Sequence, residues 1–156
     1  DPKDPTYSDP VVRDWNRKVA EGDAYIVLTT EYNHSVPGVL KNALDNVFVS
    51  YALRHKPVAA VSYSSGIAAG IRAIEHLAHM VIEADGVPLR NTVVIPFVGA
   101  AFADGVPKDP MTDIAMEVML EDLAWWAKVM TAARAAGEPP PGNVRVRAAL
   151  AARAGR

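Results

Sequence analysis

Hydrophobic positions follow two kinds of pattern that alternate along the chain. Near-continuous apolar runs occupy residues 24–29, 57–62 and 92–97. Between and after these runs, apolar residues recur at every third or fourth position, which is typical of helices with one buried face. Continuous runs predict strands buried on both faces, as in a parallel sheet. Strands that alternate with helices therefore predict an α/β fold with helices on both sides of the sheet.

The helical segments carry recognisable signals at their ends. Asp9-Pro10 predicts the start of a first helix, because an acidic N-cap and a proline in the first turn both favour initiation. Gly22 predicts its end. Further helices are predicted from about Pro37 to Tyr51, from Ile71 to Ile82, and over residues 111–136. The intervening segments, including residues 1–5 and a longer stretch before Pro110, are predicted to be loops.

The chain divides into a compact part and a tail. Residues 1–137 contain all the strands and long helices that the pattern predicts, which is enough sequence for one domain with a core. A run rich in proline and glycine follows, and residues 138–156 are rich in proline, arginine and alanine. We predict a mobile tail, with a partner-binding role as the alternative.

Composition excludes several classes of function. The formal net charge is −2, which gives no electrostatic basis for binding nucleic acid. There is no cysteine, so disulfides, thiolate metal sites and cysteine nucleophiles are excluded. No apolar run approaches the roughly 20 residues of a membrane span. We expect no nucleic acid, membrane or metal ligand, and a cytoplasmic location.

Two loops stand where a ligand site is expected. Residues 30–38 follow the first strand, residues 63–70 follow the second, and both are rich in small and polar residues. In open parallel sheets, ligands bind beyond the carboxyl ends of the strands. Both loops lead into helices, whose N-termini offer free N–H groups to electron-rich atoms. The residues alone therefore predict a polar ligand site at this edge.

The same loops resemble the NADPH-dependent FMN reductase family. The first carries Glu31-Tyr32-Asn33-His34-Ser35-Val36-Pro37-Gly38, followed by Leu40-Lys41-Asn42-Ala43-Leu44-Asp45. The second carries Ser62-Tyr63-Ser64-Ser65-Gly66 and then Gly70-x-Arg72-Ala73. The resemblance covers roughly residues 10 to 100. The first motif is the longer and more specific of the two.

The resemblance implies a flavodoxin-like three-layer sandwich that binds FMN without a covalent bond. The residues expected to line the flavin are Thr30, Glu31, Tyr32, Asn33, His34, Ser35, Tyr63, Ser64, Ser65 and Gly66. No side chain is expected to be catalytic, because the flavin carries the hydride. The co-substrate would be NADPH or NADH. The partners would be a small-molecule electron acceptor, such as a quinone or flavin, and further copies in a homodimer or homotetramer.

The chain also departs from the family pattern. Thr30 stands where the family usually has proline. The family opens with a strand and a Gly-Ser-x-Arg loop that grips the FMN phosphate, and this sequence shows neither. We therefore expect an N-terminally incomplete sheet of three strands, with an unpaired apolar edge at residues 24–29. The isolated chain is expected to bind FMN poorly or not at all, because charge-assisted hydrogen bonds to the phosphate are lost.

Other readings of these residues stay open. A non-catalytic interaction or oligomerisation module is the main alternative, and a nucleotide other than a flavin could occupy the same site. Glu31 could be a general base, although a structural or binding role is favoured. Arg72 and Glu75 could pair across a subunit contact or simply lie on an exposed helix face. His76 and His79 are spaced for a metal, but an exposed or interface face is favoured.

Overall fold

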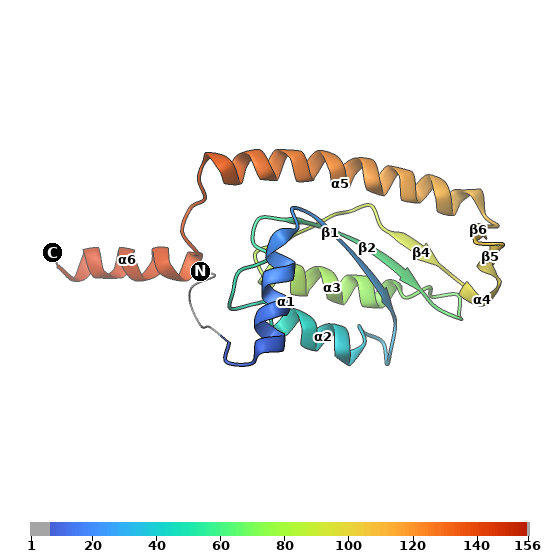
Figure 1. Ribbon diagram of the computed structural model, residues 1–156, viewed down its shortest axis with the longest axis horizontal. Coiled ribbons are helices and arrows are strands. Elements are labelled where there is room, and N and C mark those ends of the chain that lie inside the picture. The colour runs from blue at the N-terminus through green and yellow to red at the C-terminus, as the bar shows by residue number, and fades with distance from the viewer. Residues whose placement is uncertain (1–6, 156) are drawn as a thin grey trace.

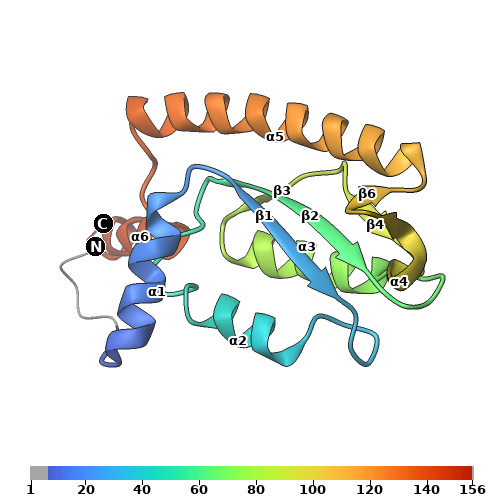
Figure 2. The ribbon, with the colours of Figure 1, turned by 45° about the vertical axis from the view of Figure 1, so that its right-hand side comes forward.

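The computed structural model describes residues 7–155 and shows three layers. A parallel sheet lies in the middle. Helix α5 (Pro110–Ala136) covers one face, and α2 (Gly38–Asp45) and α3 (Ile71–Glu83) cover the other (Figures 1 and 2). This confirms the predicted α/β class and its order of layers. The predicted loop at residues 1–5 lies outside the described residues.

Strand β2 (Pro57–Tyr63) is the centre of the main sheet. Strand β1 (Tyr25–Thr30) pairs with it in parallel, in a register that runs from Tyr25↔Val58 to Thr30↔Tyr63. Two shorter parallel strands, β3 (Val87–Pro88) and β4 (Val93–Ile95), pair with successive parts of the other edge of β2. Within residues 7–155 the main sheet thus has four strands, and the prediction of three was wrong. A two-residue strand is too short to produce a hydrophobic period.

The core lies on both faces of β2, because successive strand residues point to opposite faces. Val58 and Ala60 pack against buried residues of α3, among them Ala73, Ile74, Leu77 and Val81. Ala59 and Val61 face the other way, where they pack against α5 and β4 through Met119, Leu123, Val93 and Ile95. A strand buried on both faces explains why its sequence shows an unbroken apolar run.

Strand β1 has a free edge in the described part of the chain, where it pairs with β2 alone. Its register places Ile26 opposite Ala59 and Leu28 opposite Val61, so both side chains point to the α5 face. They are 46% and 63% exposed, because α5 packs over β2 and β4 instead. The expected unpaired apolar edge is therefore confirmed for residues 7–155.

Helix α1 (Pro10–Glu21) begins and ends where the sequence predicts. The Asp9 carboxylate accepts a hydrogen bond from the Val11 amide at 2.8 Å, and Gly22 follows the last turn. The Trp15 indole N–H donates to the Ala43 carbonyl at 2.9 Å, which fixes α1 beside α2. No helix among the described residues has the length and apolar character that crossing a membrane requires.

The predicted extent of one helix and the prediction of one loop need correction. The second helix was expected to reach Tyr51, but α2 ends at Asp45 and turns follow, in which Tyr51 and His55 both have positive φ. The stretch before Pro110 contains α4 (Val98–Ala101) and an antiparallel pair, β5 (Phe102–Ala103) with β6 (Val106–Pro107). Apolar residues at helical spacing thus continue beyond α2, although the backbone leaves the helical conformation there.

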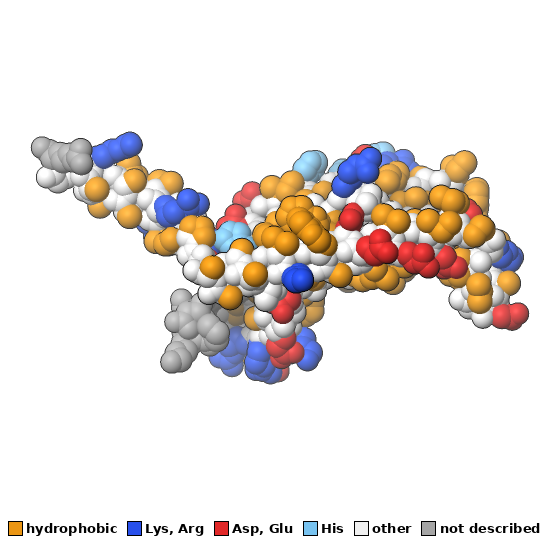
Figure 3. Space-filling view, turned by 90° about the horizontal axis from the view of Figure 1, so that it is seen from above, with side chains coloured by type: hydrophobic (Ala, Val, Ile, Leu, Met, Phe, Trp, Pro, Cys, Tyr) orange, Lys and Arg blue, Asp and Glu red, His pale blue; other side chains and the backbone are white. Residues whose placement is uncertain are grey.

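The tail forms α6 (Gly142–Ala154), where the sequence predicted no regular structure. Helix α6 projects from the body in Figures 1 and 3, and none of its residues is buried. Its first turn begins after Pro141, and alanine and arginine dominate its length. These residues have high intrinsic helix propensity, so local preference explains a helix that lacks an apolar face.

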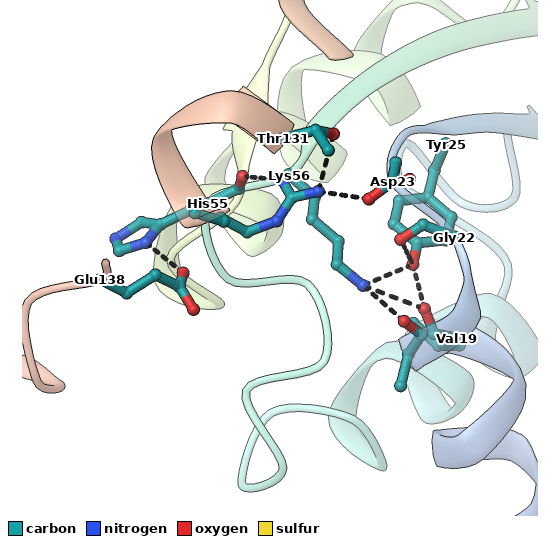
Figure 4. Close-up of polar contacts among 10 residues, drawn as sticks. Val19, Gly22, Asp23, Tyr25, His55, Lys56, Thr131 and Glu138 are labelled. Carbon is teal, nitrogen blue, oxygen red and sulfur yellow. Dashed lines mark hydrogen bonds and ion pairs between the residues drawn. The ribbon is translucent and has the colours of Figure 1, made fainter. Parts of the chain in front are cut away.

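The N-terminal ends of β1 and β2 enclose a buried lysine (Figure 4). The Lys56 side chain donates to the carbonyls of Val19 and Ala20, at 3.4 and 3.0 Å, and to the Tyr25 hydroxyl at 3.2 Å. These carbonyls end α1 and lack partners within the helix, so the ammonium group caps it. Burial lowers the pKa of Lys56, and burial raises the pKa of Tyr25 to about 12.

Arg134 joins the end of α5 to the same region. Its guanidinium donates to the His55 carbonyl at 2.8 Å and pairs with Asp23. The His55 ring lies 2.7 Å from the Glu138 carboxylate, just before α6. These polar contacts lie at the edge of the sheet opposite the carboxyl ends of the strands.

Candidate functional site

Both predicted loops leave the sheet from one pair of neighbouring residues. Thr30 ends β1, Tyr63 ends β2, and the two are partners in the parallel register. The Thr30 hydroxyl also donates to the Tyr63 carbonyl at 3.0 Å. These two residues therefore belong to strand ends, whereas the loops proper begin at Glu31 and Ser64. The expected meeting of the two loops at the carboxyl edge is confirmed.

The first loop forms a tight turn, which we call the site turn, over Tyr32–Ser35. The amides of Tyr32 and Ser35 each donate to the other residue's carbonyl, at 2.9 and 3.1 Å. The two central residues, Asn33 and His34, have φ of 48° and 69°. Two successive left-handed residues are typical of the turn that joins closely paired strands, and asparagine tolerates that conformation well. The Tyr32 side chain is 63% exposed beside this turn.

The second loop is tied to the end of β4. The Ser64 amide donates to the Ile95 carbonyl at 3.2 Å, and its carbonyl accepts from the Val98 amide at 3.0 Å. The Ser64 hydroxyl meets the carbonyl and the amide of Gly66, at 2.9 and 3.2 Å. A Cβ atom added at Gly66 would meet nothing within 4 Å, so open space lies over this glycine. The loop is thus held at its base and open at its tip.

Helix α3 reaches across to the site turn through two side chains. The Arg72 guanidinium lies 2.8 Å from a Glu31 carboxylate oxygen and 3.3 Å from Nδ1 of His34. His76, one helical turn further on, places its Nδ1 2.8 Å from the Ser35 hydroxyl. The Nε–H of Arg72 is not aligned with the Glu31 oxygen, so charge rather than a linear hydrogen bond holds this pair.

These contacts give partners within the chain to two residues of α3. Arg72 pairs with Glu31. His76 meets a serine hydroxyl, and the described residues contain no group of three histidine or acidic side chains that could hold a metal. Arg72 and His76 were missed as site residues. Their spacing of four along α3 was the available signal, but it acquires meaning only once the site turn is placed beside the helix.

The arrangement fits one edge of a planar heterocycle. The amides of Asn33, His34 and Ser65 donate no hydrogen bond within residues 7–155. The second carboxylate oxygen of Glu31 is buried and also has no partner there. The free amides belong to the two loops that leave the paired ends of β1 and β2, and the edge of a flavin ring carries acceptor atoms for such donors. The residues present therefore fit the ring portion of FMN.

The fold defines the class of protein. In a search of solved structures, the chain resembles FerB, a flavoenzyme NAD(P)H:(acceptor) oxidoreductase from Paracoccus denitrificans, with a TM-score of 0.67 at 22% identity. The match covers 79% of this chain and 70% of that one. At this level of identity the similarity establishes the fold alone, which is flavodoxin-like.

The sequence itself establishes the family. The model of the NADPH-dependent FMN reductase family matches residues 1–100, so the chain belongs to that family. The chain is 32% identical over 97 residues to a quinone reductase of Escherichia coli, a match that covers 61% of this chain and 49% of the relative. It is 43% identical over 61 residues to the NADH:(hydroxy)cinnamate reductase subunit CrdA of Vibrio ruber, covering 38% and 30%. The chain thus spans half or less of these two relatives.

Proposed function

We propose that the chain provides the flavin-ring site of an NAD(P)H-dependent FMN oxidoreductase. In this reaction a hydride passes from NADPH or NADH through FMN to a small-molecule acceptor such as a quinone or a flavin. Family membership supports the class of reaction. The observation that carries the proposal is the pairing of Thr30 with Tyr63, which brings both loops of the family motif to one edge of the sheet.

The chain's residues would bind and orient the cofactor, and FMN would supply the redox chemistry when bound. The site turn would present the amides of Asn33 and His34 to one side of the ring. Ser64, Ser65 and Gly66 would approach the other side, where glycine permits close contact with the backbone. The exposed Tyr32 ring would pack beside the flavin. Glu31 would serve structure and binding rather than proton transfer, because Arg72 already holds one of its oxygens.

Further copies of the chain are part of the proposal. A groove of about 590 Å³ lies between α2 and α3, with Leu44, Phe48 and Met80 among its apolar lining. Its rim carries Lys41 and Asp45 as an ion pair, so charges of both signs are present. A mixed rim around an apolar centre suits an isologous contact in a homodimer, or in a homotetramer built from such dimers. A cytoplasmic location accompanies the proposal, and the lack of cysteine is compatible with a reducing compartment.

The test is an assay of NADPH and NADH oxidation with added FMN and a quinone. It is run on the chain alone and on the chain joined to a family N-terminal strand–helix–strand segment. We expect quinone-dependent oxidation by the joined form, with loss of activity in Gly66→Val, whose side chain would fill the open space over the second loop. A joined form that folds and binds FMN but oxidises neither nucleotide with any acceptor would contradict the proposal.

A second candidate is a non-catalytic interaction module. The free edge of β1, with Ile26 and Leu28 exposed, favours it, because an unpaired strand is a template for another chain. The same experiment separates the two: a joined form that assembles but never binds flavin would favour the module.

A further inference from the structure

The start of α3 is held rigidly against β2. The Ser62 hydroxyl donates to the Ala69 carbonyl at 2.7 Å, just before the helix. Gly70 has φ of +83°, and a Cβ atom there would lie 2.9 Å from the Ser62 Cβ. Ala73 and Leu77 are almost completely buried in the next two turns. These contacts therefore fix the position of the first half of α3 relative to the sheet.

The site turn has far less support of its own. It projects past the end of β1, and its two central residues are exposed and left-handed, a conformation that costs free energy for residues other than glycine. Strained backbone of this kind persists where its surroundings fix it. Among residues 7–155, the polar side-chain contacts that reach Glu31 and the site turn from another element come from Arg72 and His76, on neighbouring turns of α3.

The chemistry of the Arg72 contact fixes His34 as well as Glu31. A guanidinium can only donate hydrogen bonds, so Nδ1 of His34 must accept, and the proton of the neutral imidazole lies on Nε2. The same guanidinium attracts the Glu31 carboxylate, whose second oxygen is buried without a hydrogen-bond partner among the described residues. One side chain thus sets the orientation of groups before and within the site turn.

We propose that Arg72 is the positioning residue of the flavin-ring site. Through its contacts with Glu31 and His34, Arg72 holds the site turn in a fixed position relative to α3. His76 holds the end of that turn through Ser35. The amides of Asn33 and His34 are thereby held ready for the ring before it binds. This inference rests on the proposed function for its ligand, but its structural part can be tested without any flavin.

The first experiment measures amide hydrogen exchange by NMR in the full chain. In Arg72→Met, which keeps most of the side-chain length but removes the charge and donors, the amides of Tyr32 and Ser35 should exchange at least tenfold faster. The amide of Leu77 in α3 should be unchanged. Glu75→Gln is the matched control, because Glu75 is exposed on the same helix and should alter neither. Unchanged exchange in Arg72→Met, or equal acceleration in both variants, would overturn the proposal.

The second experiment titrates FMN into the same proteins and follows flavin fluorescence. Arg72→Met should weaken FMN binding about tenfold, Arg72→Lys should recover part of the loss by restoring the charge, and Glu75→Gln should bind like the unaltered chain. A loss in Arg72→Met with no recovery in Arg72→Lys would show that charge is not the means of positioning. If neither the unaltered chain nor the form joined to a family N-terminal segment binds FMN, the proposed function fails, and the exchange result alone then decides whether Arg72 positions the turn.

Discussion

Tyr25 shows how one side chain can join three elements. Its hydroxyl donates toward the carbonyls of Val19 and Gly22 and accepts from Lys56, so it links α1, β1 and β2. The pKa of Tyr25 is raised to about 12, chiefly by burial and then by the nearby Asp23 carboxylate. The folded protein therefore keeps this proton at pH values where an unfolded tyrosine has lost it.

The consequence is an alkaline limit to this contribution to stability. Because the folded pKa lies above the unfolded value of 10.0, the contribution is complete below pH 10 and is lost as pH rises toward 12. Tyr25→Phe should lower the free energy of unfolding by about 1 kcal/mol at neutral pH, through lost hydrogen bonds. Tyrosinate absorbance of the folded protein should show a step near pH 12 that Tyr25→Phe lacks. The same step in both proteins would assign it to another tyrosine.

Single residues also mark the limit of prediction from sequence at the site. Asn33 could be placed in a tight turn, because asparagine accepts left-handed backbone. The Glu31–Arg72 pair could not be placed, because the two residues lie far apart in the chain and meet only after β1, β2 and α3 have packed. The sequence suggested a subunit contact or an exposed helix face for Arg72, whereas in the folded chain Arg72 pairs with Glu31.

At the scale of elements, substitutions of Leu28 in β1 and of its partner Val61 in β2 are expected to have different consequences for stability. The two residues are register partners, but Leu28 is 63% exposed on the free edge of β1 whereas Val61 is 3% exposed beneath α5. Leu28→Lys should leave the free energy of unfolding within about 0.5 kcal/mol and reduce concentration-dependent light scattering, since charged edge residues oppose strand pairing. Val61→Ala should cost about 2 kcal/mol in denaturant unfolding.

A large loss of stability in Leu28→Lys would mean that other protein covers this side chain in solution. Unchanged scattering would remove the free edge as a site of self-association.

The tail allows a matched pair of truncations. Helix α6 has no buried residue, so deleting residues 142–156 should change the free energy of unfolding by less than about 0.5 kcal/mol. Deleting residues 138–156 also removes Glu138 and Pro139, which contact His55 and Arg54. This longer deletion should cost about 1 kcal/mol. Equal effects on urea unfolding would show that the Glu138–Pro139 contacts contribute nothing.

The sequence predicted the elements in which burial of one or both faces produces a regular pattern of hydrophobic residues. The starts of α1 and α5 follow from Asp9-Pro10 and Asp109-Pro110, and both aspartates cap their helices. By contrast, α6 follows intrinsic propensity without burial, and β3 is too short to show a pattern. Helix α2 ends at Asp45, and the turns after it contain Tyr51 and His55 with positive φ, a conformation that neither residue type predicts.

At the scale of the whole molecule, the described residues form a sheet whose carboxyl ends carry the candidate site and whose strand β1 has one unpaired edge. The carboxyl ends of β1, β2 and β4 hold the site loops, while the N-terminal ends are closed by Lys56 and Arg134. Under the proposed function, the described residues would contact the ring of FMN, and we identify none among them for its phosphate. We therefore expect the 156-residue chain to bind FMN weakly, and orders of magnitude more weakly than the form joined to a family N-terminal segment.

The most direct test maps the binding of FMN onto the uniformly ¹⁵N-labelled chain by NMR. If the paired loops form the ring site, the largest amide shifts should occur together at Asn33, His34, Ser65 and Gly66, even when binding is weak. Shifts centred on the groove between α2 and α3, or on one loop without the other, would contradict this account.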